Sequence, residues 1–267
     1  IQLEALRNIP ARRLVNSSLL KPSNDCYESA ADGTRPCALK PKPSLHALES
    51  GAFHRVPVLL GYTADDGLGS VELEQVGFDE TSVRNEAQLQ SFMRREFGDT
   101  ASEALRRYTV GQQPTGRKRL RAALDNLSQD VWYSAATWHM ANALAAAPEP
   151  PPVYVYQFTQ RVHQQAVPCT PKQAWHGCDT TFWNGEEPIR PDECSCHNHP
   201  RPSETPLGKT MFEYLINFCT TGSPNSVASP DAPQLPYWQA HSTRRPGRHM
   251  ELGNAIGMNE LPPSEVE

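Results

Sequence analysis

The sequence predicts an α/β fold in which helices cover a parallel or mixed sheet. Two short apolar runs, residues 55–62 and 153–158, have the composition of strands, and the stretch between them is dominated by helical periodicity. Parallel strands cannot be joined by a tight hairpin, so they need long crossover segments of this kind. Strands that alternate with long helical segments therefore indicate an α/β sheet.

The first strand is predicted at residues 55–62, RVPVLLGY. The run is short and apolar and has no helical period, and its Pro57 and Gly61 favour a buried strand over a helix. The sequence TADDG follows at 63–67 and is typical of a turn. Earlier in the chain, residues 2–20 resemble two short helices, and residues 21–48 are polar and rich in proline, which predicts an irregular connection.

Three helices are predicted between the two strands, at residues 82–97, 101–108 and 117–147. Gly98 provides a stop for the first helix, and the three prolines at 150–152 follow the last. The longest helix carries one apolar stripe, formed by Leu120, Leu124, Leu127, Val131, Trp138 and Leu144. We expect this stripe, and Trp138 in particular, to lie in the core.

The remaining elements are a second strand, a helix and a short last strand. Residues 153–158, VYVYQF, are aromatic and β-branched, as in a buried strand. Residues 206–221 begin with a proline and are followed by Gly222, which predicts a helix with a defined start and stop. Residues 249–253 are a candidate short strand. Two or three strands are too few to complete an open sheet, so we expect a second polypeptide to supply the rest.

Charge and hydropathy exclude some classes of function. The net charge of −5 gives no reason to expect a nucleic-acid partner. No apolar run approaches the roughly 20 residues that span a bilayer. We therefore expect neither nucleic-acid binding nor a membrane span.

The cysteines favour an oxidising compartment. Six of the seven lie in loop-like sequence, which favours disulfides over buried thiols, and Cys26 with Cys37 is the pair we predict first. Sequons for N-glycosylation begin at Asn16 and Asn126. Together these features predict a secreted or secretory-pathway glycoprotein.

Two turns could carry chemistry. Asp65 and Asp66 follow the first strand, and His176 follows the second strand after a further loop. If the two strands are neighbours, the turns meet at one edge of the sheet, where α/β proteins place their sites. A carboxylate that accepts the Nδ1 proton of a histidine fixes its tautomer and stabilises the imidazolium during proton abstraction. An acid followed by a histidine is the second half of the order Ser…Asp/Glu…His.

Five segments resemble the type-B carboxylesterase and cholinesterase family. They match, in the family's order, the segment after the nucleophile domain, the strand with its acid turn, the next core strand, the histidine motif and a late helix. In this chain they read LEALRNIPARRLV, VPVLLGYTADDG, VYVYQF, WHGCDTTFWNG and FEYLINFCTTGSPN. The resemblance implies that residues 1–267 are the C-terminal half of a single α/β-hydrolase domain, with a mixed, mostly parallel sheet.

The resemblance also implies roles for two residues. Asp66 takes the place of the triad acid, and His176 takes that of the general base. Asp66 stands where the family usually has glutamate, so its turn must lie closer to the histidine or make a looser contact. Asp65 is the weaker candidate for the acid. Ala5 replaces the family's usual cysteine, which puts the corresponding disulfide in doubt.

The nucleophile is missing from this stretch, because no Gly-x-Ser-x-Gly motif occurs in the 267 residues. We therefore expect a partner chain that carries the N-terminal half, with the serine and the oxyanion donors. The assembly would hydrolyse a small-molecule carboxylic ester without metal or organic cofactor. The alternative is a non-catalytic adhesion or structural protein on the same fold.

Other candidate residues have simpler interpretations. Asp179 is expected to stabilise its own loop through backbone amides. Trp175, Phe182 and Trp183 are equally consistent with a substrate pocket and with packing around the histidine. The cysteines and histidines of CSCHNH, 194–199, match zinc spacing poorly, which favours a disulfide-pinned loop over a metal site.

Overall fold

The computed structural model describes residues 47–48, 50–67, 83, 85–109, 117–162, 173–184, 205–225 and 235–261. The chain divides into two compact units, residues 1–54 and 55–267, and almost all that is described belongs to the second. The predicted helix pair at 2–20 and the predicted Cys26–Cys37 pair lie outside the described residues.

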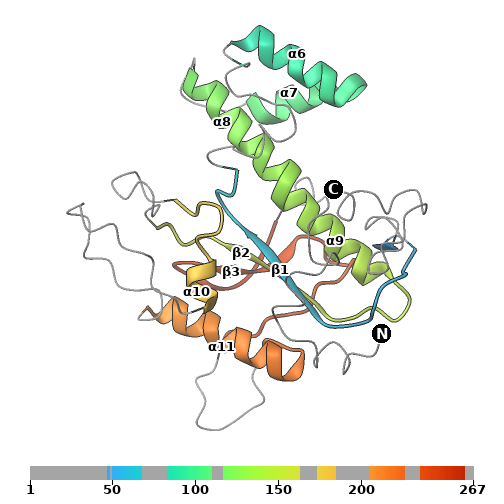
Figure 1. The fold of residues 1–267 in the computed structure, drawn as a ribbon, viewed down its shortest axis with the longest axis vertical. Helices are drawn as coiled ribbons and strands as arrows, with labels where there is room; N and C mark the ends of the chain where they lie inside the picture. Colours follow the sequence, from blue (N-terminus) through green and yellow to red (C-terminus); the bar gives the residue numbers. More distant parts are fainter. Residues whose placement is uncertain are drawn as a thin grey trace, which may run out of the picture. The chain divides into compact units, whose positions relative to one another are not determined.

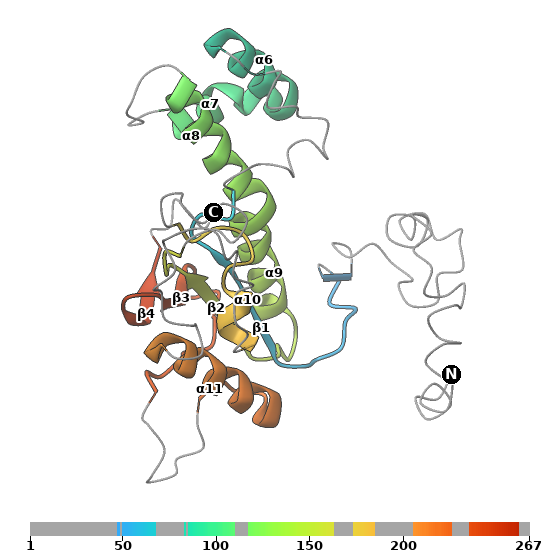
Figure 2. The ribbon, with the colours of Figure 1, turned by 60° about the vertical axis from the view of Figure 1, so that its left-hand side comes forward.

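The described strands form one four-stranded sheet in the order β1-β2-β3-β4 (Figures 1 and 2). Its strands are β1 (Val58–Thr63), β2 (Val153–Phe158), β3 (Arg248–Leu252) and β4 (Ile256–Glu260). The first three are parallel, and β4 is antiparallel to β3. A mixed, mostly parallel sheet is therefore confirmed. The hairpin strand β4 was not predicted, since IGMNE has few of the residues that favour strands.

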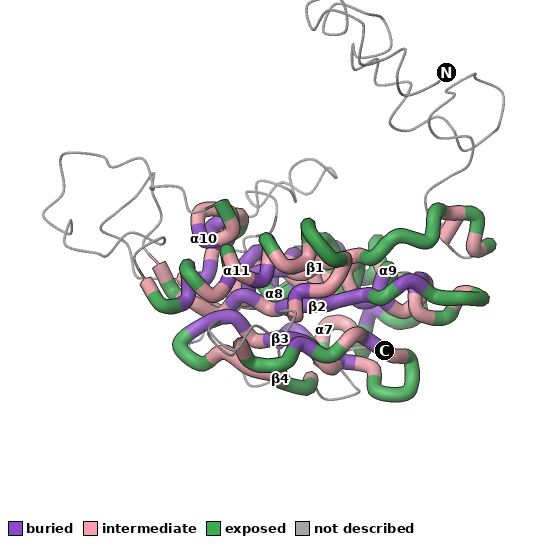
Figure 3. Tube along the Cα trace, turned by 90° about the horizontal axis from the view of Figure 1, so that it is seen from below, coloured by how far each residue is buried: buried purple, intermediate pink, exposed green. Residues whose placement is uncertain are grey.

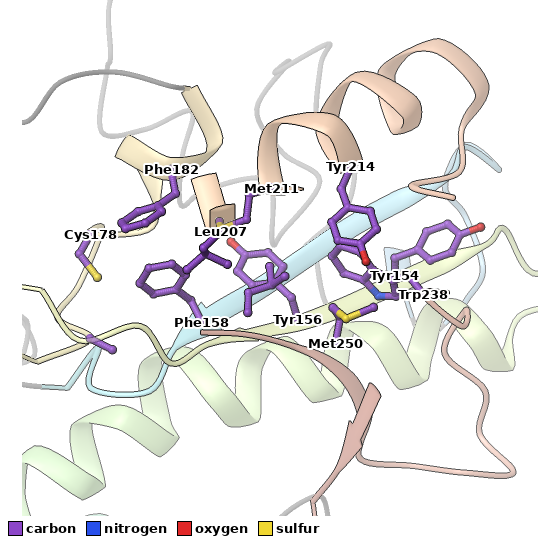
Figure 4. Close-up of a cluster of buried hydrophobic side chains, with 12 residues drawn as sticks. Tyr154, Tyr156, Phe158, Cys178, Phe182, Leu207, Met211, Tyr214, Trp238 and Met250 are labelled. Carbon is purple, nitrogen blue, oxygen red and sulfur yellow. The ribbon is translucent and has the colours of Figure 1, made fainter. Parts of the chain in front are cut away.

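Strand β2 occupies the middle of the sheet and is almost wholly buried (Figure 3). Tyr154, Tyr156 and Phe158 alternate onto one face, where they pack against helices α10 (Thr180–Asn184) and α11 (Pro206–Thr221) (Figure 4). The α8–α9 helix lies on the opposite side of the strands. The prediction of a buried strand at 153–158 is thus confirmed. Helices cover the sheet on both sides, so the side chains that alternate to either face of β2 are apolar.

Helix α11 has the predicted bounds, and both of its ends have a local cause. The Thr205 side chain caps the N-terminus by accepting the Gly208 N–H at 3.0 Å. At the other end Gly222 adopts φ 78°, the left-handed conformation that glycine tolerates best. A Cβ at Gly222 would also lie 2.8 Å from Cγ of Pro57, so the glycine lets the helix end close to the start of β1.

Two shorter helices form a second hydrophobic cluster with the start of α8. Helix α6 (Glu86–Phe97) ends at Gly98 as predicted, but begins later than predicted because Asn85 caps it through the Gln88 N–H. A short 3₁₀ turn, η3 (Gly98–Thr100), leads into α7 (Ala101–Thr109). The cluster comprises Val83, Leu89, Phe92, Met93, Ala101, Tyr108, Leu120, Ala123, Leu124 and Leu127.

The long helix predicted at 117–147 contains a π-helical turn. It consists of α8 (Arg117–Ser128), the π turn η4 (Gln129–Ser134) and α9 (Ala135–Ala146). Most of the predicted stripe is buried, including Trp138 at 1% exposure, but Val131 is 49% exposed. The prediction for Val131 was wrong because a π turn bonds residue i to i+5, and its extra residue rotates the apolar face. No helix among the described residues is long and apolar enough to cross a bilayer.

Two buried histidines flank Trp138, and they predict acid-sensitive stability. His241 Nε2 lies 2.9 Å from Asn142 Oδ1, and His249 Nδ1 lies 2.8 Å from the Gly247 carbonyl oxygen. Burial lowers the pKa of both imidazoles, although the Gly247 carbonyl and Glu251 partly oppose this for His249. The unfolded chain therefore binds protons more readily, so the free energy of unfolding should fall as pH drops below about 6.5.

Substituting His249 tests this expectation. His249→Asn keeps a donor near the Gly247 carbonyl but cannot be protonated, so Tm should fall less between pH 7.5 and pH 5.5 than in the wild type. Thermal unfolding by circular dichroism measures the difference. His139→Asn, at an exposed histidine on α9, is the control and should keep the wild-type slope. An unchanged slope in His249→Asn would contradict the assignment.

Candidate active site

The turn after β1, residues 63–67, is held from two sides; we call it the acid turn. Within it, the Thr63 N–H donates to Asp66 Oδ2 at 2.6 Å. From η4, the side chain of Gln129 donates from Nε2 to the Thr63 carbonyl at 3.0 Å and accepts the Gly67 N–H on Oε1 at 2.9 Å. A Cβ at Gly67 would lie 2.1 Å from the Asp125 carbonyl oxygen, so only glycine lets the turn approach the helix this closely.

Residues 173–179, which we call the histidine loop, are tied to the acid turn by Asp65. The Asp65 N–H donates to the Ala174 carbonyl at 2.9 Å, and the Ala174 N–H donates to Asp65 Oδ2 at 2.9 Å. Val162 and Gln173 also exchange two backbone hydrogen bonds of 2.9 Å each. Asp65, the weaker acid candidate, therefore binds the main chain of the loop with both its own N–H and its carboxylate. These bonds join the acid turn and the histidine loop into one unit.

Asp66 and His176 are in direct contact. Oδ1 of Asp66 lies 2.9 Å from Nδ1 of His176, across 110 positions of sequence. The aspartate contact is therefore not looser than a normal hydrogen bond, despite the side chain that is one methylene shorter than glutamate. The Asp66 side chain is 4% exposed and that of His176 is 56% exposed. The catalytic role of the pair stays a prediction.

Burial controls the charge of the acid. Desolvation raises the pKa of Asp66 above its ordinary value, and the hydrogen bonds from Thr63 and the nearby His176 oppose this rise. An ionised carboxylate can only accept, so it places the neutral imidazole's proton on Nδ1. Nε2 of His176 is then the basic nitrogen, on a ring that is more than half exposed. This arrangement suits a general base that is oriented by a carboxylate.

Tyr133, also on η4, packs against the histidine. The rings of Tyr133 and His176 have centroids 4.9 Å apart and planes inclined by 43°. Sequence reasoning missed both Tyr133 and Gln129, because their sequence neighbourhood reads as an ordinary apolar helix. The one local sign of an irregular helix was the polar pair Gln129 and Asp130, which lies between Leu127 and Val131 of the apolar stripe.

Asp179 behaves differently from the sequence prediction. Its carboxylate accepts the hydroxyl of Tyr156, with Oη 2.7 Å from Oδ2, rather than a backbone amide of its own loop. Burial, followed by the charge of Asp179, raises the pKa of Tyr156. A Cβ at Gly61 would lie 2.4 Å from the Tyr156 ring, so the glycine in β1 makes room for this tyrosine. The hydroxyl of a central strand thereby anchors the end of the histidine loop.

The aromatic residues of this region are packing residues in the described structure. Phe182 is 4% exposed and its ring centroid lies 5.1 Å from that of Phe158, while Trp183 packs edge-on against Tyr156 at 5.2 Å. Trp175 is partly buried against the same cluster. Of the two open interpretations, these contacts favour packing around the histidine loop.

A cavity of about 460 Å³ borders η4, with walls that include Tyr62, Tyr108, Gln129 and Gln157. Neither Asp66 nor His176 lines this cavity. We therefore do not assign it to a substrate of the pair.

Within the described ranges, no group of three or more His, Cys, Asp or Glu could hold a metal ion. The sequence 194–199 lies outside those ranges. Cys178 is buried, and burial raises its pKa; Cys219 is exposed. Both are free thiols, and the other five cysteines are not described.

The sequence matches a known protein family over almost its whole length. The model of the carboxylesterase family matches residues 2–264. The chain belongs to this family. In agreement, the structure resembles the crystal structure of a Geobacillus stearothermophilus carboxylesterase, with a TM-score of 0.59 and 22% sequence identity. No curated protein matches the chain by sequence.

The carboxylesterase match confirms the predicted α/β-hydrolase fold. The alignment covers 98% of this chain but 49% of the Geobacillus chain, so the protein described here spans about half the length of that relative.

Proposed function

We propose that this chain supplies the base and the acid of a serine carboxylic-ester hydrolase. The observation that carries the proposal is the 2.9 Å contact between Asp66 Oδ1 and His176 Nδ1, made by two turns of a carboxylesterase-family chain. The substrate class is a small-molecule carboxylic ester. The chemistry requires no metal or organic cofactor, because the proton transfers and the covalent step use side chains alone.

In the proposed reaction, a serine Oγ attacks the ester carbonyl while Nε2 of His176 takes the hydroxyl proton. Asp66 accepts a hydrogen bond from the Nδ1–H throughout, without taking the proton, and stabilises the imidazolium. When the tetrahedral intermediate collapses, the carbon–oxygen bond to the alcohol breaks, and His176 returns the proton to the leaving oxygen. Water then attacks the acyl-serine by the same proton transfers, which releases the acid and restores the serine.

The nucleophile is proposed to lie on a separate chain that carries the N-terminal half of the domain. Two observations support a missing half: the 267 residues contain no Gly-x-Ser-x-Gly, and the chain covers only half of its structural relative. In the described sheet β1 is an edge strand, and such an edge is usually covered in a stable protein.

Exposed apolar residues also favour a covering half. Val56, just before β1, is 56% exposed. Val131, Trp132 and Met140 on the η4–α9 segment are 38–49% exposed. A partner polypeptide that continues the sheet beyond β1 would shield such surface from water.

The secretory location remains a proposal. Asn126 is exposed on α8, which leaves its side chain accessible to a glycan, but Ser128 of the same sequon is completely buried. Modification at Asn126 would therefore have to precede folding. Mass spectrometry of the protein from its native source, before and after a glycosidase that removes N-linked glycans, tests this assignment: an unchanged mass would contradict glycosylation.

Fluorophosphonate labelling tests the proposed function. The assembly that contains this chain should react with the probe at one serine, within a Gly-x-Ser-x-Gly peptide of the copurifying N-terminal half. Mass spectrometry of the labelled peptide identifies the site. If no copurifying chain is labelled, the assembly is not a serine hydrolase, and the non-catalytic adhesion or structural role is favoured instead.

A further inference from the structure

We propose that the π turn η4 is a positioning element for both members of the acid–base pair, acting through Gln129 and Tyr133. This inference rests on the proposed function, since it concerns the same site. Gln129 fixes the turn that bears Asp66, and Tyr133 fixes the ring plane of His176. A single turn of helix thus sets the relative placement of two groups that are 110 residues apart in sequence.

Gln129 is suited to this task because an amide both donates and accepts. Its Nε2 donates to the carbonyl of Thr63, and its Oε1 accepts the N–H of Gly67. The two backbone groups lie at opposite ends of the acid turn, with Asp66 between them. The amide therefore closes the turn, and fixes the direction in which the Asp66 carboxylate leaves the backbone.

Tyr133 acts on the other partner. Its ring packs at 4.9 Å against the His176 ring, on an imidazole that is 56% exposed and so has few other neighbours to restrain it. The bond from Nδ1 to Asp66 restrains one point of the ring but leaves rotation about that bond. Contact with the tilted Tyr133 ring limits this rotation, and thereby fixes where Nε2 points.

The π geometry is itself anchored. The Ala135 N–H donates to the Asp130 carbonyl, the i→i+5 bond that defines the turn. The Asp130 carboxylate accepts the hydroxyls of Tyr108 at 3.0 Å and Ser134 at 2.9 Å, and Arg107 lies 3.5 Å away. These bonds secure the turn to α7. π turns are rare in proteins, but those that occur are often found at functional sites, which agrees with a positioning role.

The test compares substitutions at both positions in the complete assembly, with kcat expressed per serine labelled once the fluorophosphonate reaction has run to completion. Tyr133→Leu removes the ring, whereas Tyr133→Phe retains it. Gln129→Met keeps the volume of the side chain but can neither donate nor accept. Misplacement of reacting groups by about 1 Å costs on the order of 100-fold in rate. We therefore expect kcat to fall 10- to 100-fold in Tyr133→Leu and Gln129→Met, with KM little changed.

The controls separate positioning from folding. Tyr133→Phe should restore kcat to within about threefold of the wild type, since the ring is retained. Gln239→Met, at an exposed glutamine, controls for the loss of a side-chain amide and should leave kcat unchanged. A purely structural role would lower the number of reactive serines but not kcat per reactive serine.

The outcomes distinguish this proposal from the one on which it rests. If the wild-type assembly hydrolyses no ester and binds no probe, the proposed function fails. If the wild type is active and both Tyr133→Leu and Gln129→Met keep wild-type kcat per labelled serine, the positioning role of η4 is overturned and the esterase assignment stands. Should Gln129→Met fail to fold, the Tyr133 pair alone decides the question.

Discussion

His176→Ala is expected to lower kcat of the complete assembly by about 10⁶-fold, the size of loss seen when the base of a serine triad is removed. Without the imidazole, the serine hydroxyl has no proton acceptor and remains a weak nucleophile. Fluorophosphonate labelling of the partner's serine should slow in parallel, because it needs the same activation. Steady-state ester hydrolysis and the rate of labelling measure the two effects.

The stability of the variant should change little, since the His176 side chain is more than half exposed. His139→Ala, at an exposed histidine on α9, controls for the loss of a surface imidazole and should retain wild-type kcat. Retention of wild-type labelling in His176→Ala would show that another group activates the serine. In that event the 2.9 Å contact with Asp66 would be structural.

Asp66→Asn is expected to lower kcat by about 10⁴-fold, the scale of the loss when a triad aspartate becomes an amide. The Thr63 N–H, 2.6 Å from Oδ2, would orient the new amide with its oxygen toward Thr63. Its NH₂ group would then face Nδ1 of His176 and donate to it. This forces the proton onto Nε2, the nitrogen that should accept from the serine.

The loss in Asp66→Asn should not be a loss of fold. Burial raises the pKa of Asp66, so the folded protein pays for ionising this group, and the cost grows as pH rises through its unfolded pKa. The neutral amide removes that cost, so Tm at pH 7.5 should be equal to or above that of the wild type. Asp99→Asn, at an exposed aspartate, is the matched control. Wild-type kcat in Asp66→Asn would rule out an orienting role.

Much of the fold could be predicted because its signals are local. Helix α11 carries its stop in Gly222, and β2 is apolar on both faces, so each is recognisable without knowledge of its neighbours. Helix α10 was missed because its five residues are too few to show a helical period, and β4 was missed because IGMNE has few of the residues that favour strands. The exposure of Val131 was missed because the hydrophobic pattern was counted with the α-helical period throughout. Nothing in the sequence marks the point at which the π turn adds a residue and rotates the helix face.

Of the candidate site, only the acid and the histidine could be predicted from the sequence. The turn containing Asp66 follows an obvious strand, and His176 lies in a recognisable motif, but Gln129 sits 62 positions beyond Gly67. The Gln129 amide binds backbone groups, which every residue has. No residue type near Asp66 therefore indicates that a glutamine binds this turn. Likewise, the bond between Tyr156 and Asp179 joins residues 23 positions apart, and Gly61 on the neighbouring strand leaves room for the tyrosine ring.

The backbone pairing of Val162 with Gln173 has a consequence for how the protein can vary. Two backbone hydrogen bonds hold Val162 and Gln173 together, and Asp65 holds Ala174, the next residue, by two more hydrogen bonds. Lengthening or shortening residues 163–172 should therefore leave the imidazole of His176 where it is. We expect an affinity tag or fluorophore inserted in this stretch to leave the contact between Asp66 and His176 intact.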